Sequence, residues 1–126
     1  RATQAYIRKE LGLKHIRIVE GSGLSRKNHL SAYDMLAILE KFKPYKDLLK
    51  SQDRVLYKTG SLRGIRTRAG YIESQILGPC YFAVFFNRKG SNMQAMVRCL
   101  KKAVNKAATR RTGMIEIRPR HDVPSF

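Results

Sequence analysis

Residues 55–86 read VLYKTGSLRGIRTRAGYIESQILGPCYFAVFF. Three runs in this stretch have the composition and periodicity of β-strands. They are the β-branched and aromatic run at 55–59, the alternating run at 65–72 and the continuous apolar run at 80–86. The connections are short, with a turn expected over 60–64 and a break expected at Gly78-Pro79. This pattern predicts an antiparallel meander in which 65–72 is half-exposed and 80–86 is a central strand.

Segments on both sides of the meander have helical periodicity. Ser31 and Asp34 can form a capping box at the start of a helix over 32–42, and Pro44 ends this helix and can open a shorter one. After the meander, Asn92 can cap a last helix. The apolar stripe of that last helix consists of Met93, Met96, Val97, Leu100, Val104 and Ala107.

The N-terminal residues predict a helix, a short strand and a loop. Residues 2–11 have helical character, and Gly12 can stop that helix. The alternation in 15–20 indicates a strand, and the glycines and serines of 21–28 indicate a loop. The chain as a whole therefore has the pattern of an α+β protein, with an antiparallel sheet and flanking helices.

Length and charge limit which domain organisation and which class of partner are possible. The 126 residues suffice for one domain with a core, and no apolar run reaches the ~18 residues of a membrane span. We expect one unit over 1–107, followed by a basic tail over 108–126 that contains a short β-like run at 114–117. The formal net charge of +17 fits either a solvated basic surface or a site for polyanions.

Neither the cysteines nor the histidines predict a metal or cofactor site. Cys80 and Cys99 do not form a C-x-x-C pattern, so we expect buried free thiols, with a single bridge between them as the alternative. His15, His29 and His121 lack the spacing of metal ligands. We therefore expect no metal and no cofactor.

The stretch Lys58-Thr59-Gly60-Ser61 suggests a binding or catalytic site. A lysine on a strand edge supplies fixed positive charge, and a threonine hydroxyl can donate a hydrogen bond to a carboxylate. A glycine lets a ligand backbone lie against the strand without meeting a Cβ atom. Together these residues suit a ligand that ends in a carboxylate and binds as an added strand.

Several motifs occur in one order along residues 5–105. They are GSGLSRKN at 21–28, KTGSL at 58–62, AGYI at 69–72 and an aromatic strand ending in Asn at 81–87. Lys-Thr-Gly is also the third signature of active-site serine penicillin-binding proteins and β-lactamases. In this order the motifs resemble the C-terminal part of the D-alanyl-D-alanine carboxypeptidase family, peptidase family S13, the class C low-molecular-mass penicillin-binding proteins. The resemblance implies a partial β-lactamase/transpeptidase-like fold in a periplasmic or otherwise extracytoplasmic hydrolase.

The resemblance also implies roles for four residues. Lys58 would bring positive charge to the cleft and contact the proton-transfer network. Thr59 and the Ser61 hydroxyl would bind the terminal carboxylate of a peptidoglycan stem peptide ending in D-Ala-D-Ala, or the carboxylate of a β-lactam. The Ser61 backbone N–H would be one of two oxyanion-hole donors, and Gly60 would allow the close approach of the substrate.

Two family motifs are absent from the chain. Neither Ser-x-x-Lys, which holds the nucleophile of this class, nor Ser-x-Asn occurs in the 126 residues. In the family both precede the stretch matched here. We therefore expect the chain to be a C-terminal segment that is inactive alone, with the N-terminal part of the same domain as its partner. Glu20 also departs from the family, which usually has Asp before Gly-Ser-Gly.

A small basic nucleic-acid-binding domain is the alternative function. It would use the net charge of +17 together with stacking aromatic side chains. The candidates for stacking are Tyr57, Tyr71, Tyr81, Phe82, Phe85 and Phe86. The aromatics of 81–86 lie in a continuous apolar run, however, which favours a place in the core.

Overall fold

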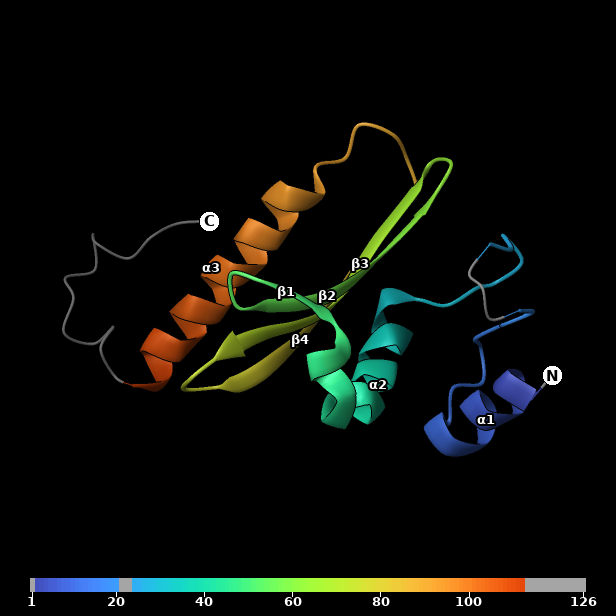
Figure 1. The fold of residues 1–126 in the computed structure, drawn as a ribbon, viewed down its shortest axis with the longest axis horizontal. Helices are drawn as coiled ribbons and strands as arrows, with labels where there is room; N and C mark the ends of the chain where they lie inside the picture. Colours follow the sequence, from blue (N-terminus) through green and yellow to red (C-terminus); the bar gives the residue numbers. More distant parts are fainter. Residues whose placement is uncertain (1, 21–23, 113–126) are drawn as a thin grey trace.

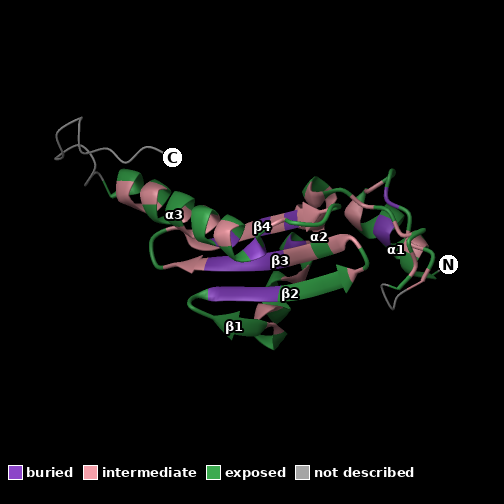
Figure 2. Ribbon diagram, turned by 90° about the horizontal axis from the view of Figure 1, so that it is seen from above, coloured by how far each residue is buried: buried purple, intermediate pink, exposed green. Residues whose placement is uncertain are grey.

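The structure, a computed structural model, describes residues 2–20 and 24–112 (Figure 1). Four strands form one antiparallel sheet in the order β1-β2-β3-β4, and helices α2 and α3 cover its two faces (Figures 1 and 2). The elements are α1 (Ala2–Leu11), α2 (Ala32–Phe42), the 3-10 helix η1 (Lys43–Leu48), β1 (Lys50–Gln52), β2 (Val55–Leu62), β3 (Ile65–Ser74), β4 (Gly78–Phe86) and α3 (Met93–Arg111). The predicted α+β class and antiparallel sheet are confirmed. Among the helices described, none combines the length and apolarity needed to cross a bilayer.

The strands are longer than the sequence predicts, and the turns are shorter. β2 continues through Gly60 to Leu62, so the turn expected over 60–64 contains only Arg63 and Gly64. Gly64 has a φ of +76°, which allows a two-residue hairpin connection. The break expected at Gly78-Pro79 is also wrong, because both residues pair with the end of β3. A fourth strand, β1, adds to the predicted meander.

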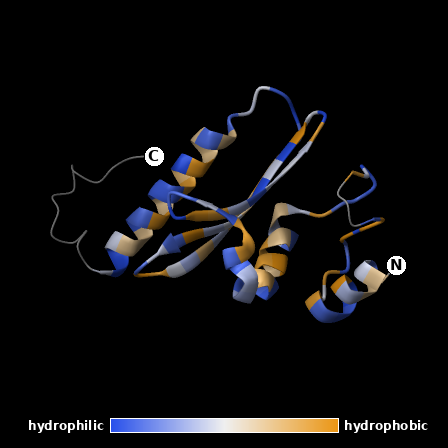
Figure 3. Ribbon diagram, in the orientation of Figure 1, coloured by the Kyte–Doolittle hydropathy of each residue, from blue (hydrophilic) through white to orange (hydrophobic). Residues whose placement is uncertain are grey.

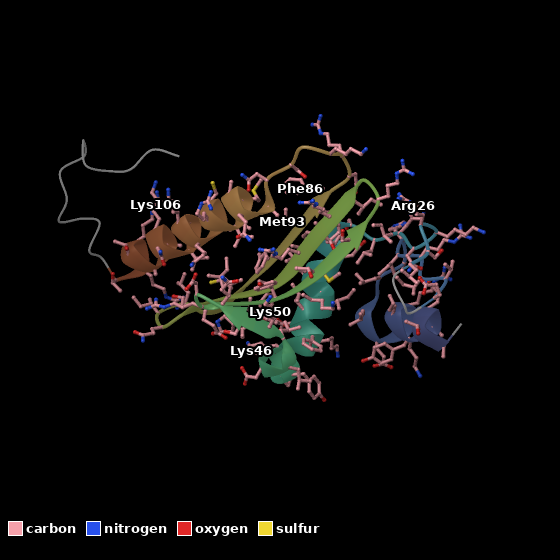
Figure 4. All side chains as sticks on the ribbon, turned by 45° about the horizontal axis from the view of Figure 1, so that its top comes forward. Arg26, Lys46, Lys50, Phe86, Met93 and Lys106 are labelled. Carbon is pink, nitrogen blue, oxygen red and sulfur yellow. The ribbon has the colours of Figure 1, made fainter. Side chains whose placement is uncertain are left out.

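Two apolar cores lie on opposite faces of the sheet. The core beneath α3 contains Val55, Tyr57, Ile72, Phe82, Val84, Met93 and Val97. In Figure 4, the labelled Met93 and Phe86 mark the region where the first turn of α3 meets β4. The core beneath α2 contains Leu39, Leu56, Ala69 and Tyr71. The sheet is therefore the middle layer of three.

The middle of β3 is buried on both faces of the sheet. The sequence predicts a half-exposed strand, yet Gly70 and Ile72 are buried together with Ala69 and Tyr71. The difference arises because α3 covers one face of these residues and α2 the other. Tyr71 is fully buried, and its hydroxyl donates a 2.5 Å hydrogen bond to the carbonyl oxygen of Leu39 in α2.

Local signals place α2 and η1 as predicted. The Ser31 hydroxyl accepts from the Asp34 N–H at 3.0 Å, and the Asp34 carboxylate accepts from the Ser31 N–H at 3.0 Å. This reciprocal pair is a capping box. Pro44 lies at the start of η1. The Lys46 ammonium in η1 donates to Glu73 at 2.5 Å, which ties this corner to the end of β3. That contact raises the pKa of Lys46.

The N-terminal segment forms a small unit beside the sheet (Figure 1). The Gln4 amide fastens α1 to the following segment, because it donates to the Ile16 carbonyl at 2.8 Å and accepts from the Ile18 N–H at 2.6 Å. The prediction of a strand over 15–20 is wrong. Only Arg17 makes a β-bridge, to His29, since no longer strand lies alongside in this part of the described chain.

Helix α3 follows its predicted apolar stripe in part. The Asn92 side chain accepts from the Ala95 N–H at 3.0 Å and so caps the helix as predicted. Hydrophobic and hydrophilic positions alternate along α3 (Figure 3). Met96 and Ala107 lie outside the core, contrary to the predicted stripe. The helix also continues to Arg111, beyond the unit boundary expected at residue 107, while the β-like run at 114–117 lies outside the described residues.

Both cysteines are free, and they differ in environment. Cys80 is half-buried, and burial raises the pKa of its thiol. Cys99 is exposed on α3, so the expectation of two buried thiols is wrong for this residue. The alternative of a bridge between the two is wrong as well.

Strands β2 and β3 approach each other very closely at Gly70. A Cβ atom at this position would lie 1.9 Å from the carbonyl oxygen of Leu56 and 2.8 Å from the Cα atom of Tyr57. Both neighbours belong to the backbone of β2, which cannot move aside without breaking the pairing. The absence of a side chain at residue 70 is therefore a condition for the register between the two strands.

The Gly70→Ala variant should be strongly destabilised. We expect its free energy of unfolding to fall by about 2–4 kcal/mol, because the added methyl group overlaps the backbone of β2. Gly90→Ala is the matched control, since a Cβ atom at Gly90 meets nothing within 4 Å. Its φ of +82° should cost only about 1 kcal/mol. Urea unfolding of both variants measures the difference, and equal losses would contradict the steric argument.

The stability of the protein should fall at alkaline pH in a way that depends on Tyr71. Burial raises the pKa of Tyr71 to about 12, whereas the unfolded side chain ionises near pH 10. Between these values the unfolded chain releases a proton that the folded chain keeps, so stability decreases as pH rises. Tyr71→Phe should remove this part of the decrease, and at pH 7 it should cost about 1 kcal/mol for the lost hydrogen bond.

The control for this measurement is Tyr33→Phe. Tyr33 is 81% exposed, so its replacement controls for the loss of a tyrosine hydroxyl and should leave the stability at pH 7 unchanged. Unfolding free energies of the three proteins between pH 8 and pH 11 provide the comparison. A wild-type slope that survives in Tyr71→Phe would assign the alkaline effect to other groups.

Candidate functional site

The second half of β2 has an unpaired edge. β1 pairs only with Val55, Leu56 and Tyr57, so the edge opposite β3 has no strand partner within the described chain from Lys58 to Leu62. In Figure 2, β2 changes along its length from buried to exposed. An unpaired edge offers backbone N–H and C=O groups to another extended chain.

The register determines which backbone groups point outward from this edge. Leu62 pairs with Ile65 across the two-residue turn, and residues in such a pair exchange hydrogen bonds with each other. Because the direction alternates along an antiparallel strand, Lys58 and Gly60 also face β3. The N–H and C=O groups of Thr59 and Ser61 therefore point toward the open edge.

The side chains of the four predicted site residues divide between the two faces of the sheet. Thr59 and Ser61 share the face of Tyr57, beneath α3, whereas Lys58 and Gly60 share the other face. The Lys58 ammonium turns back to the edge and donates to the Thr59 carbonyl at 3.2 Å. The structure thus brings the Lys58 charge and the Thr59 backbone together at the edge.

The space beside Gly60 is limited by a side chain of β3 as well as by any ligand. A Cβ atom at this position would lie 2.5 Å from the Thr67 hydroxyl oxygen of β3. A side chain at residue 60 would therefore displace Thr67 in addition to covering the outer strand surface. This contact is invisible in the sequence motif, because it depends on the register between β2 and β3.

A groove follows the open edge on the face covered by α3. It consists of three cavities of about 720, 180 and 400 Å³, and all three are lined by Arg68 of β3 and Gln94 of α3. The largest also includes Ser61, and the 400 Å³ cavity includes Lys58 and Thr59. We call these three cavities together the edge groove.

The edge groove is strongly basic. Its cationic lining residues are Lys50, Lys58, Arg66, Arg68, Arg88, Lys89, Arg98 and Lys101. Asp53 is the single acidic residue among the residues that line it. These positive charges lie beside the exposed backbone of β2, where they favour a negatively charged ligand.

The N-terminal unit supports the hairpin that ends the open edge. The Arg26 guanidinium donates to the carbonyl oxygen of Arg63, in the turn between β2 and β3. The loop that carries Arg26 is fixed by Asn28, whose side chain accepts from the Val19 N–H at 2.8 Å, and by Glu20, which accepts from the Ser25 N–H at 2.8 Å. Glu20 thus has a structural contact in the predicted loop, of which residues 21–23 lie outside the described chain.

Sequence reasoning missed the edge groove, including the two residues that line all three of its cavities. Arg68 and Gln94 bear no motif, and only the strand register and the position of α3 bring them beside Thr59. The alternation in 65–72 places Arg68 on the same face as Ile72. It therefore predicts to which face the Arg68 side chain belongs, but not which residues lie beside it. Among the described residues, no group of three or more His, Cys, Asp or Glu side chains is arranged to hold a metal ion.

The open edge should be detectable by amide hydrogen exchange. We expect the Thr59 and Ser61 amides to exchange rapidly, because they point to solvent, and the Lys58 and Gly60 amides to be protected by β3. Tyr57, which pairs with Lys50 of β1, is an internal control for a covered position. Measurement by NMR resolves the four neighbouring amides, and equal protection of all four would contradict the open edge.

Comparisons with protein-family models, with curated proteins and with solved structures find no match to this chain.

Proposed function

We propose that the chain is the C-terminal segment of a serine D-Ala-D-Ala carboxypeptidase or endopeptidase, a penicillin-binding protein that acts on peptidoglycan peptides outside the cytoplasm. One observation carries the proposal. The Lys-Thr-Gly-Ser stretch lies on a strand edge that no other described strand pairs with, and the backbone N–H and C=O groups of Thr59 and Ser61 are directed outward. Such an edge binds an extended peptide through backbone hydrogen bonds.

In the complete enzyme, a serine from the N-terminal part of the domain attacks the carbonyl carbon before the terminal D-Ala. The Ser61 N–H donates to the oxygen that becomes negatively charged, and the peptide bond then breaks. D-Ala leaves as an amine after it gains a proton, and a serine ester remains. Water hydrolyses this ester to release the shortened peptide. A β-lactam acylates the same serine.

The segment supplies binding and charge to these steps. The Thr59 and Ser61 hydroxyls bind the carboxylate of the substrate, and both lie on the face of the edge groove. Lys58 adds positive charge beside the reacting bond, consistent with its position at the Thr59 carbonyl. Gly60 keeps the strand surface flat between them. The nucleophile comes from elsewhere, so the segment is inactive alone.

Unpartnered surfaces support the N-terminal part of the same domain as a partner. The outer edge of β4 has no strand beside it within the described residues, and α1 has few contacts with the other helices and strands. Tyr33 and Leu48 are 81% and 80% exposed on the side of α2 and η1. A further strand on β4 and helices over these side chains would complete the layers.

The alternative, a nucleic-acid-binding domain, rests on the basic edge groove. Stacking of bases requires exposed aromatic faces. Tyr57, Tyr71 and Phe82 are buried in the two cores, and Tyr81, Phe85 and Phe86 are half-buried. This arrangement gives bases few rings to stack on and favours the peptide-binding function.

Penicillin acylation tests the proposal. In a chain extended N-terminally to include the nucleophile, labelled penicillin should form a stable adduct that mass spectrometry detects. Thr59→Val should slow the adduct's formation about tenfold, because one hydrogen bond to a carboxylate is lost. Thr67→Val is the matched control, since Thr67 lies on the neighbouring strand and on the opposite face of the sheet from Thr59.

Two results would contradict the proposed function. The first is the absence of any adduct on the extended chain. The second is an adduct on residues 1–126 alone, because this segment holds no Ser-x-x-Lys. Equal rates for Thr59→Val and Thr67→Val would remove the assigned role of Thr59 in binding the carboxylate.

A further inference from the structure

Positive charge gathers on the face of the sheet that α3 covers. Residues 74–112, which include β4 and α3, contain no Asp or Glu. Six cations from β3, from the loop before α3 and from α3 itself line the edge groove on this face. We call them the groove cations, and they are Arg66, Arg68, Arg88, Lys89, Arg98 and Lys101.

The groove cations have no counter-charge within the described chain. Glu40 lies in α2, and Glu73 is bonded to Lys46 of η1, so both belong to the other face of the sheet. Asp53 lines the groove, but no described carboxylate forms an ion pair with a groove cation. Mutual repulsion of these cations therefore favours the binding of an anion from outside.

Arg68 is where a hydrogen-bond acceptor is most clearly missing. Its guanidinium carbon lies 4.6 Å from the centroid of the Tyr57 ring, and its buried Nε atom has no hydrogen-bond partner among the described residues. The Lys50 ammonium lies 5.9 Å from the centroid of the same ring, so two positive charges share it. Buried donors normally have partners, and an oxyanion in the groove would supply one.

The groove is elongated along α3. Its three cavities share Arg68 and Gln94, and the helix positions that line them begin at the Asn92 cap and end at Lys101. At a rise of 1.5 Å per residue, this stretch is about 14 Å long. Phosphates follow one another about every 3.4 Å along a DNA strand, so roughly three to four of them fit this length. A linear polyanion can therefore contact more of the groove cations than a single small anion can.

The surroundings of the groove disfavour two kinds of polyanion. Bases stack on exposed rings, yet the one aromatic residue that lines the groove among the described residues, Tyr57, is buried. A membrane surface needs apolar side chains beside the cations. Among the large apolar side chains described as more than half exposed, only Leu48 borders the groove, and the others belong to α1, α2, η1 or the loop after α1.

We propose that the edge groove binds a linear phosphodiester chain, and that the groove cations recognise its phosphates without recognising bases. The paired donors of a guanidinium match the geometry of a phosphate, and Arg66, Arg68, Arg88 and Arg98 supply four such groups. This site does not depend on the peptidase function. It uses side chains on the α3 face of the sheet, whereas the peptide binds to the backbone of the β2 edge.

Two labelled chains of equal length test the proposal on the full 126-residue protein. One is an abasic oligodeoxynucleotide, which has the phosphodiester backbone alone, and the other is the thymine oligonucleotide. Fluorescence anisotropy measures both affinities over a range of salt concentrations. We expect equal affinities within about threefold. The plot of log K against log salt should have a slope of about −2 to −3, because three to four phosphates are neutralised.

Three variants locate the binding to the groove. Arg88→Gln and Lys101→Gln each remove one groove cation, and each should weaken the binding of the abasic chain about fivefold and flatten the salt slope by about 0.7. Arg88 is exposed in a loop, so its replacement leaves the core intact. Lys41→Gln is the matched control, because it removes the same charge from an exposed position on α2 and should change neither quantity.

Several outcomes would overturn the proposal. Equal losses in Lys41→Gln and the two groove variants would assign the binding to net charge alone. An affinity for the thymine chain more than tenfold above that for the abasic chain would assign the groove to nucleic acid. Binding to phosphatidylglycerol vesicles that an excess of the abasic chain fails to displace would assign the basic surface to a membrane. Penicillin acylation of the extended chain reports on the proposed function separately.

Discussion

The contact between Gly70 and the backbone of β2 fixes the register on which the site depends. With only hydrogen on the Gly70 Cα, the strand can pass against Leu56 and Tyr57, and Tyr57 then lies directly opposite residue 70. Two residues along, the same register sets Thr59 beside Arg68. A shift by one residue would turn every side chain of β2 to the other face and would separate this pair. Tight packing in the middle of the sheet thus determines the chemistry available at its edge.

The elements with strong local signals could be predicted from the sequence. The capping box at Ser31 and the Asn92 cap act within one helical turn, and both helices begin where those residues indicate. The limits of β2 could not be predicted, because Gly60 resembles a turn residue until its pairing with Thr67 is known. The single bridge at Arg17 likewise depends on tertiary contacts, since its alternating neighbours have the pattern of a strand.

The candidate site, too, could be predicted from the sequence only in part. The Lys58–Ser61 stretch could be identified from its residue types, but only Lys58 and Thr59 lie in the predicted strand, whereas Gly60 and Ser61 fall in the predicted turn. The open edge arises because β1 begins only at Lys50 and so pairs with no residue of β2 beyond Tyr57, and the three residues of β1 carry no clear sequence signal. Arg68 is an ordinary polar residue of an alternating strand in the sequence. Its place in the edge groove depends on the strand register and on its contact with the Tyr57 ring, both of which require the folded arrangement.

The strand order of the sheet follows the order of the chain, and this has a consequence for how the protein folds. Each strand pairs with its neighbour in sequence through a short connection. Loop closure is therefore inexpensive in entropy, and the meander can form rapidly from local hairpins. The outer edge of β4, nine residues long, has no strand partner among the described residues. An unpaired edge presents backbone N–H and C=O groups to other chains, so newly made chains can associate through it.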